Sequence, residues 1–103
     1  MPAKAKKRFN RLIVYGDSFT YGHGLSDCFR PPHHAGDKPS ELGWAARLAK
    51  NLGISEVLNF SYPGASNRYI AHKVLETDSI GIDDLLIIQL VFLIEIFISK
   101  ILL

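Results

Sequence analysis

The stretch that decides the fold is Arg11-Leu12-Ile13-Val14-Tyr15-Gly16, which runs directly into the polar segment 17–24. A short apolar run that ends in glycine is typical of a buried strand. The polar segment has two more glycines, Gly22 and Gly24, and therefore predicts a loop. We expect a strand over residues 11–16 that presents a serine, Ser18, just beyond its carboxyl end.

Two helices and two further strands are predicted downstream of this loop. Segment 26–39 contains three prolines and predicts a surface loop. Ser40 is expected to cap a helix that ends at Gly53, because apolar residues recur three or four apart between them. A strand over residues 57–60 follows, then a helix capped by Ser66 and running to about residue 76. The last predicted strand covers residues 85 to about 91.

Strands that alternate with helices predict an α/β fold with a parallel sheet and right-handed crossovers. We expect the spatial order second, first, third strand. The chain has 103 residues, enough for one domain. Its 48% hydrophobic and 21% charged residues exclude a disordered chain and a collagen, and its single cysteine, Cys28, excludes a disulfide scaffold.

The net charge of +2 is unevenly distributed along the chain. All five basic residues of segment 1–11 precede the first acidic residue, Asp17, so the rest of the chain is slightly acidic. Segment 1–11 is therefore interpreted as a solvated basic tail, and binding to nucleic acid is not expected. The apolar run 12–15 is too short for a signal peptide, which favours a cytoplasmic protein.

The other end of the chain is unusually apolar. Between residues 85 and 103 only Gln89, Glu95, Ser99 and Lys100 are not apolar. The run is almost long enough to cross a bilayer, but a central carboxylate is costly in lipid. A buried strand followed by an irregular segment is favoured over a membrane helix. The chain is thus divided into a basic tail 1–11, a domain 12–91 and an atypical apolar tail 92–103.

Two glycine-containing loops are expected at the carboxyl ends of the strands, where open parallel sheets bind their ligands. One is Gly16-Asp17-Ser18, and the other covers residues 62–67 with Gly64 inside it. A serine hydroxyl held after a strand can attack a substrate, and exposed backbone N–H groups can stabilise an oxyanion. Gly64 allows close approach of its backbone because it has no Cβ.

Both loops resemble blocks of a known family. Segment 16–24, Gly-Asp-Ser-Phe-Thr-Tyr-Gly-His-Gly, resembles the first block of the GDSL, or SGNH, hydrolases, and segment 59–67, Asn-Phe-Ser-Tyr-Pro-Gly-Ala-Ser-Asn, resembles the second. The resemblance covers residues 12–91. It implies a three-layer α/β/α parallel sheet of the flavodoxin-like type, here truncated to about three strands. It also implies an esterase that cleaves a small-molecule ester without a cofactor, with Ser18 as nucleophile and the N–H groups of Ser18 and Gly64 as oxyanion-hole donors.

Two other blocks of the family have no counterpart here. The third strand is not followed by Gly-x-Asn-Asp, and no Asp-x-x-His occurs in the chain. The general base and its orienting carboxylate are therefore missing, and we expect a truncated or inactive member. The sequence departs from the family pattern after about Gln89, which is the pattern expected of a shifted reading frame and can be tested in the downstream coding DNA.

Several alternatives stay open. His23, five residues after Ser18, could substitute as base, although a residue of a glycine-rich loop is the favoured interpretation. His33 and His34 lack further ligands at zinc spacing, so no metal site is predicted. Asp17 is expected to hydrogen-bond within its loop. The chain could instead be a non-catalytic protein that associates with a membrane or a partner through residues 85–103, and an exposed edge of the third strand predicts oligomers or aggregates.

Overall fold

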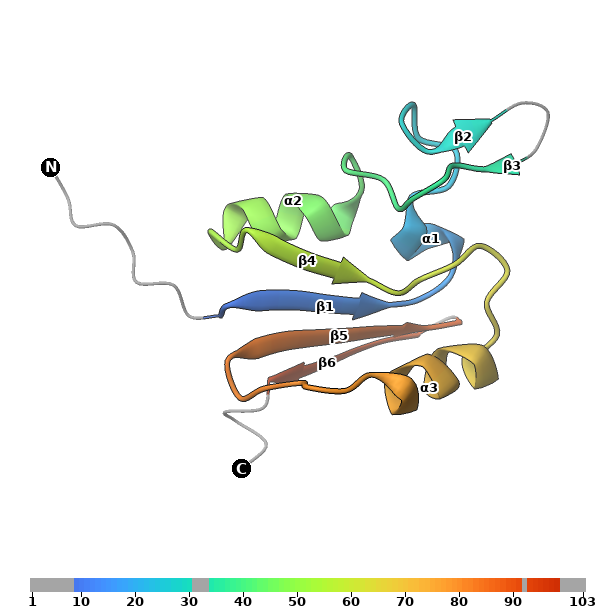
Figure 1. Cartoon of the computed structure of the whole chain (residues 1–103). Coiled ribbons are helices and arrows are strands. Elements are labelled where there is room, and N and C mark those ends of the chain that lie inside the picture. The colour runs from blue at the N-terminus through green and yellow to red at the C-terminus, as the bar shows by residue number, and fades with distance from the viewer. Residues whose placement is uncertain (1–8, 31–33, 92, 99–103) are drawn as a thin grey trace, which may run out of the picture.

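The computed structural model describes residues 9–30, 34–91 and 93–98 (Figure 1). Their helices and strands, in chain order, are β1 (Arg11–Tyr15), α1 (Ser18–Tyr21), β2 (Phe29–Arg30), β3 (His34–Ala35), α2 (Trp44–Asn51), β4 (Glu56–Asn59), α3 (Asn67–Glu76), β5 (Asp84–Leu90) and β6 (Leu93–Ile98). The predicted alternation of three strands with two helices is confirmed for β1, α2, β4, α3 and β5, and β6 follows it. The segments predicted as loops are partly regular, because segment 17–24 contains the short helix α1 and segment 26–39 contains the antiparallel pair β2 and β3.

The main sheet has the order β4-β1-β5-β6, and β1 pairs in parallel with both β4 and β5. The predicted spatial order of the three parallel strands is thus confirmed. Helix α2 packs on one face of the sheet and α3 on the other (Figure 1). The chain therefore has an α/β fold in which helices flank a three-stranded parallel sheet.

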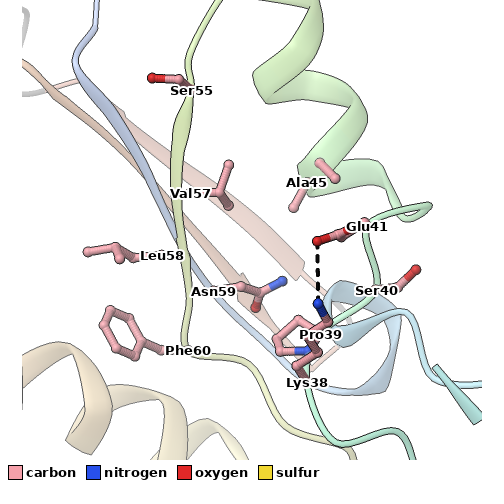
Figure 2. A pocket seen from close by; sticks show the side chains of 11 residues that line it. Lys38, Pro39, Ser40, Glu41, Ala45, Ser55, Val57, Leu58, Asn59 and Phe60 are labelled. Atoms are coloured by element: carbon pink, nitrogen blue, oxygen red, sulfur yellow. Dashed lines mark ion pairs between the residues drawn. The ribbon is translucent and has the colours of Figure 1, made fainter. Parts of the chain in front are cut away.

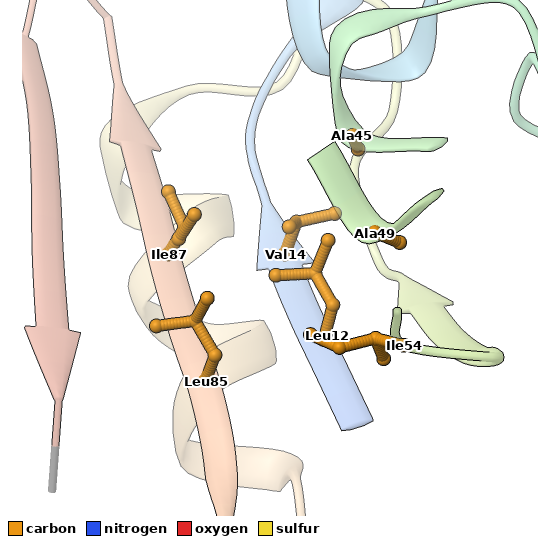
Figure 3. Packing of buried hydrophobic residues seen from close by; sticks show 7 residues of the cluster. All are labelled: Leu12, Val14, Ala45, Ala49, Ile54, Leu85 and Ile87. Atoms are coloured by element: carbon orange, nitrogen blue, oxygen red, sulfur yellow. The ribbon is translucent and has the colours of Figure 1, made fainter. Parts of the chain in front are cut away.

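The buried residues form two clusters, one on each face of the sheet. On the α2 face, Leu12 and Val14 of β1 pack with Leu85 and Ile87 of β5 and with residues of α2 (Figure 3). On the α3 face, Ile13 and Tyr15 pack with Ile70. All four apolar residues of β1 are fully buried, because a central strand of a parallel sheet is covered on both faces. This explains why its sequence is a continuous apolar run.

Residues 93–98 are not irregular, as was expected for the apolar tail, but form β6. This strand pairs antiparallel with β5, from Leu90 opposite Leu93 to Leu85 opposite Ile98. The expectation that β5 lies at the sheet edge is therefore wrong. A sequence rich in isoleucine has high β propensity, and pairing satisfies backbone groups of β5 that would otherwise stay free. No helix within the described ranges is long and apolar enough to cross a membrane.

Helix α2 is capped three residues later than predicted, at Gly43 instead of Ser40. The Ser40 hydroxyl donates to Asp27 Oδ1 at 2.5 Å and accepts from the N–H of Leu42 at 2.9 Å, in a turn that precedes the helix. Asp27 also accepts from the N–H of Glu41 at 2.7 Å. Residues 41–43 therefore form bends beside the Asp27 carboxylate, and the helix starts after Gly43.

The end of α2 is as predicted. Gly53 has a φ of +70°, and its N–H donates to the carbonyl of Lys50 at 3.2 Å. The N–H of Ile54 donates to the carbonyl of Ala49 at 2.8 Å. This pair of bonds is the Schellman motif, which requires a left-handed residue after the last helical turn and so favours glycine there.

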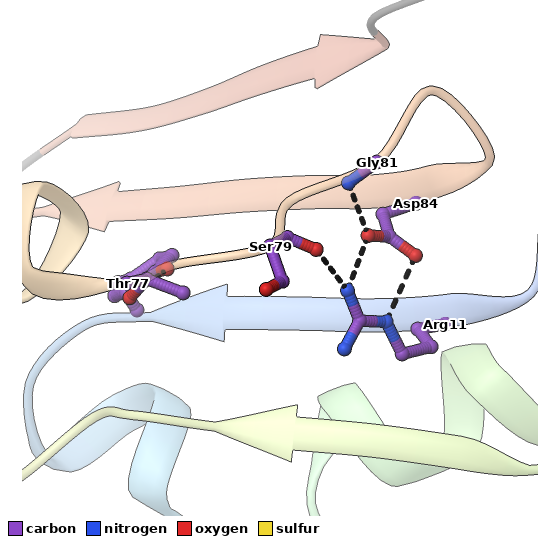
Figure 4. Close-up of polar contacts among 6 residues, drawn as sticks. Arg11, Thr77, Ser79, Gly81 and Asp84 are labelled. Atoms are coloured by element: carbon purple, nitrogen blue, oxygen red, sulfur yellow. Dashed lines mark hydrogen bonds and ion pairs between the residues drawn. The ribbon is translucent and has the colours of Figure 1, made fainter.

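The amino end of the sheet is held by an ion pair between neighbouring strands (Figure 4). Arg11 donates from Nε to Asp84 Oδ1 at 3.0 Å and from Nη2 to Asp84 Oδ2 at 2.6 Å. Nη2 also donates to the carbonyl of Ser79, and Asp84 Oδ2 accepts from the N–H of Gly81. Asp84 is only 5% exposed, and hydrogen bonding from Arg11 lowers the pKa of its carboxyl below the usual range.

Candidate active site

Ser18 lies directly beyond the carboxyl end of β1, as the sequence predicts. It is the first residue of the four-residue helix α1, and it is exposed. Asp17 precedes this helix and accepts from the N–H of Phe19 through Oδ1 at 3.0 Å. The prediction that Asp17 hydrogen-bonds within its own loop is therefore confirmed. Nothing in this geometry gives Asp17 the role of an acid catalyst.

Gln89 of β5 hydrogen-bonds to this turn, a role that the sequence did not predict. Its Oε1 accepts from the N–H of Asp17 at 3.0 Å and from the hydroxyl of Thr20 at 2.9 Å. Its Nε2 donates to the carbonyl of Leu90 at 2.9 Å. Gln89 is 6% exposed, so these bonds satisfy an amide that is almost completely buried. The available signal was a single amide side chain inside an otherwise apolar strand.

Asn59 of β4 approaches the same turn from the other side of β1. Its Nδ2 donates to the carbonyl of Thr20 at 3.2 Å. Its Oδ1 accepts from both the N–H and the hydroxyl of Ser61. Thr20 is therefore held by one amide side chain from each strand that neighbours β1. The sequence indicates Asn59 only as the first residue of the second block.

The loop between β4 and α3 is hydrogen-bonded to the Ser18 turn. The N–H of Tyr62 donates to the carbonyl of Gly16 at 3.1 Å, and the Tyr62 ring contacts the Tyr21 ring edge-on, with centroids 5.8 Å apart. Within the loop, the N–H of Ala65 donates to the carbonyl of Tyr62 at 3.1 Å, while Gly64 has a φ of +81°. Proline followed by a left-handed glycine is the pattern of a type II turn.

The start of α3 is joined to the end of β5. Ser66 caps α3, since its Oγ accepts from the N–H of Tyr69 at 3.1 Å, which confirms the predicted cap. Asn67 Oδ1 accepts from the N–H of Val91 at 2.6 Å. The three carboxyl-end segments, after β1, β4 and β5, are therefore linked by direct hydrogen bonds.

The backbone N–H groups of these loops fall into two sets. Those of Asp17, Phe19 and Tyr62 are bonded to Gln89, Asp17 and Gly16, as given above. Those of Ser18 and Gly64 make no hydrogen bond with any other residue that the structure describes. The two amides that the family resemblance assigns to an oxyanion hole thus belong to exposed residues and have no partner among the described residues.

His23 follows the end of α1. The left-handed Gly22 ends the helix, and the N–H groups of Gly22 and His23 both donate to the carbonyl of Ser18, at 2.9 and 3.2 Å. The His23 backbone is therefore adjacent to Ser18, and its side chain is exposed. The Ser18 hydroxyl forms no hydrogen bond with another described residue. A role for His23 as base stays a prediction.

The other histidines and Cys28 are placed away from this chemistry. His72 lies on the surface of α3 and pairs with Glu76 at 2.5 Å. His33 falls outside the described residues, and of His34 only the backbone is described, in β3. Cys28 is buried. In the part of the chain that the structure describes, no three His, Cys, Asp or Glu residues are grouped so that they could hold a metal ion.

A pocket of about 520 Å³ lies along the free edge of β4 rather than over Ser18 (Figure 2). Lys38 and Glu41, which pair at 3.5 Å, face Val57 and Asn59 across it. Asn59 lines this pocket and also binds the Thr20 carbonyl, so one end of the pocket adjoins the Ser18 turn.

Comparison with known proteins gives no relative for this chain: no protein-family model, no curated protein and no solved structure matches it.

Proposed function

We propose that this chain carries the nucleophile and oxyanion-hole part of a serine ester hydrolase of the SGNH, or GDSL, type. The observation that supports the proposal is the combination of an exposed Ser18 with two unbonded backbone amides, on Ser18 and Gly64, in loops that are hydrogen-bonded to each other. Donors held in place before the reaction stabilise a developing oxyanion without reorganisation. The carboxyl edge of a parallel sheet is also the place where such folds bind ligands.

In the proposed reaction, Ser18 Oγ attacks the carbonyl carbon of a small ester and its proton passes to a base. The carbonyl oxygen becomes an oxyanion that accepts from the N–H groups of Ser18 and Gly64. Collapse of this intermediate breaks the ester C–O bond, and the leaving oxygen takes the proton back from the base, which releases the alcohol and leaves acyl-Ser18. Water, giving a proton to the same base, then attacks acyl-Ser18, and the proton returns to Ser18 Oγ as the free acid leaves. The chemistry needs no metal or organic cofactor.

The described residues place no general base at Ser18, because no described side chain hydrogen-bonds the Ser18 hydroxyl. Serine is a weak nucleophile when no base accepts its proton, and triad residues act as a unit. We therefore expect the isolated chain to be nearly inactive, and its labelling by a fluorophosphonate to stay at background.

An external base tests the proposal. Hydrolysis of 4-nitrophenyl acetate is followed at increasing imidazole concentration, and the rate of Ser18→Ala is subtracted as background. We expect a Ser18-dependent rate that rises with imidazole and an acetylated Ser18 in the digested protein. Equal rates for wild type and Ser18→Ala at every imidazole concentration would contradict the proposal.

The rate measured without imidazole tests whether His23 acts as the base. A Ser18-dependent rate that is present without imidazole and absent in His23→Ala would identify His23 as the base. His72→Ala is the matched control, because His72 lies on the outer surface of α3 and pairs with Glu76. If His23→Ala leaves this rate unchanged, His23 is only a loop residue.

A second candidate function rests on β6. This strand ends the sheet within the described residues, and its sequence, Leu93–Ile98, has one charged residue, Glu95. An apolar edge strand is a template for pairing with another strand, which favours a non-catalytic protein that associates through this edge. Size-exclusion chromatography tests it: a concentration-independent monomer would contradict association through β6.

A further inference from the structure

Among the residues that the structure describes, Gln89 is the side chain of β5 that hydrogen-bonds to the Ser18 turn. One oxygen, Oε1, serves two donors, the N–H of Asp17 and the hydroxyl of Thr20. The other end of the amide, Nε2, is bonded to the carbonyl of Leu90 on its own strand. The side chain can therefore neither rotate nor flip without breaking three bonds.

The hydrogen bonds of Gln89 and Asp17 determine which backbone N–H of the turn is left without a partner. Gln89 occupies the N–H of Asp17, and the Asp17 carboxylate in turn occupies the N–H of Phe19. Ser18 lies between them, and its N–H has no partner among the described residues. Of the three successive amides, only that of the nucleophile itself is left for a ligand.

Gly16 shows how closely this arrangement is packed. A Cβ at Gly16 would lie 2.5 Å from Gln89 Oε1 and 2.5 Å from Thr20 Oγ1, well inside contact distance. The turn and Gln89 can therefore reach each other only because residue 16 has no side chain. This is a reason for glycine at this position that does not depend on its φ angle.

We propose that Gln89 is the positioning residue of the nucleophile turn: by holding the N–H of Asp17 and the hydroxyl of Thr20, it orients the Ser18 peptide so that, of the three successive amides of this turn, only the Ser18 N–H is left for the substrate oxygen, together with the Gly64 N–H of the second loop. This inference rests on the proposed function, because the orientation matters for catalysis only if an oxyanion forms beside Ser18. Gln89 touches neither substrate nor reacting atoms, so its effect passes through Asp17 and Thr20.

The test uses the full chain, 4-nitrophenyl acetate and imidazole as external base, with the Ser18→Ala rate subtracted. Gln89→Met keeps the length and apolar contacts of the side chain but removes the acceptor. We expect its Ser18-dependent kcat to fall at least tenfold while KM changes less than twofold, because positioning acts on the transition state. A wild-type kcat in folded Gln89→Met, or a change in KM alone, would overturn the proposal.

Hydrogen exchange of the Asp17 amide gives a second readout that does not require activity. We expect at least tenfold faster exchange in Gln89→Met, and near wild-type exchange in Gln89→Glu, which keeps an acceptor oxygen. If the wild type shows no Ser18-dependent turnover, the proposed function fails. In that case the exchange rate of the Asp17 amide tests the role of Gln89 by itself. Faster exchange in Gln89→Met supports the positioning role, and unchanged exchange overturns it.

Thr20→Val is the second variant, which tests the same network if Gln89→Met does not fold. This replacement has nearly the same shape and removes one of the two donors to Gln89 while the Asp17 bond remains. We expect kcat to fall by a smaller factor, about two- to fivefold, at unchanged KM. An unchanged kcat in folded Thr20→Val would count against positioning through this network.

Discussion

The two ends of β1 are joined to β5 by different chemistry. At the amino end, a charged pair, Arg11 and Asp84, connects residues that lie opposite each other in the parallel ladder. At the carboxyl end, the neutral amide of Gln89 binds the backbone and the hydroxyl of the turn that follows β1. The charged pair is bonded further to the carbonyl of Ser79 and the N–H of Gly81, whereas the N–H of Ser18 beside the neutral network has no partner among the described residues. One end carries a nearly buried ion pair, and the other carries an exposed serine.

The difference lies in what each contact joins. Arg11 and Asp84 pair two full charges across the ladder, whereas the Gln89 amide joins neutral groups of the turn that carries Ser18, next to the Asp17 carboxylate. Measurements of stability and of Ser18-dependent turnover separate the two ends.

The largest effect is expected for Gly16→Ala at the carboxyl end. The added Cβ would lie 2.5 Å from both Gln89 Oε1 and Thr20 Oγ1, so the network must open. We expect a loss of ~2–3 kcal/mol in the free energy of unfolding, as for an overpacked core, together with loss of Ser18-dependent turnover. Urea denaturation and the imidazole assay measure these two quantities.

Gly24→Ala is the matched control for this prediction. Gly24 has a φ of +94° and nothing lies within 4 Å of an added Cβ. We expect only backbone strain, about 1 kcal/mol, and no change in turnover. Gly16 does not have a positive φ, so equal losses in the two variants would show that contact with Gln89 and Thr20 costs no more than the backbone strain at the open position 24.

Asp84→Ala is expected to have the next largest effect, and only on stability. It removes the acceptor of three hydrogen bonds, from Arg11 and from the N–H of Gly81, at a residue that is 5% exposed. We expect a loss of about 2 kcal/mol in the free energy of unfolding. Ser18-dependent turnover of the folded protein should be unchanged, because the pair lies at the other end of β1.

Glu41→Ala is the control for Asp84→Ala. Glu41 pairs with Lys38 at 3.5 Å, but both side chains are more than 70% exposed. Exposed pairs contribute little to stability, so no measurable change is expected. A similar loss in both variants would indicate that the Arg11–Asp84 pair contributes no more than a surface pair.

The smallest effect is a dependence of stability on acid pH that comes from Asp84. Hydrogen bonding from Arg11 lowers the pKa of Asp84 in the folded protein below that of the unfolded chain. Its contribution is therefore complete above the unfolded pKa, about 4, and is lost as pH falls through the lower folded pKa. The difference in unfolding free energy between wild type and Asp84→Ala should narrow at acid pH. A difference that stays constant or widens down to acid pH would contradict this assignment.

Local patterns in the sequence predicted much of the fold. The apolar run of β1, the cap at Ser66 and the left-handed Gly53 each depend on neighbours a few residues away, and the structure has all three. The predicted start of α2 at Ser40 failed for the opposite reason. Asp27, thirteen residues earlier in the chain, accepts from the Ser40 hydroxyl and from the N–H of Glu41, and these bonds hold the chain in a turn before the helix. Local rules cannot weigh a competitor from a different loop.

The residues of the candidate site also fall into two groups, those that the sequence predicted and those that it did not. Ser18 and the glycine of the second loop were found in the sequence because they follow strands directly. The amides of Gln89 and Asn59 were not, since Gln89 bonds to a residue 72 positions earlier and Asn59 to one 39 positions earlier. Strand β6 was missed because its composition is equally compatible with a buried strand, an irregular tail or an apolar helix.

The sequence by itself determined the order of the three parallel strands and of α2 and α3 along the chain, the burial of β1 and the place of Ser18 beyond its end, because periodicity, caps and turn glycines act over a few residues. It did not predict α1, β2 or β3, which lie in segments interpreted as loops. Only the tertiary structure decided that β6 covers β5, that Arg11 pairs with Asp84, and that Gln89 and Asn59 hold Thr20. These contacts join segments far apart in the chain, and they form only after the sheet has brought the strands side by side. The hydrogen-bonding partner of a buried polar side chain is therefore a property of the assembled sheet, not of the local sequence.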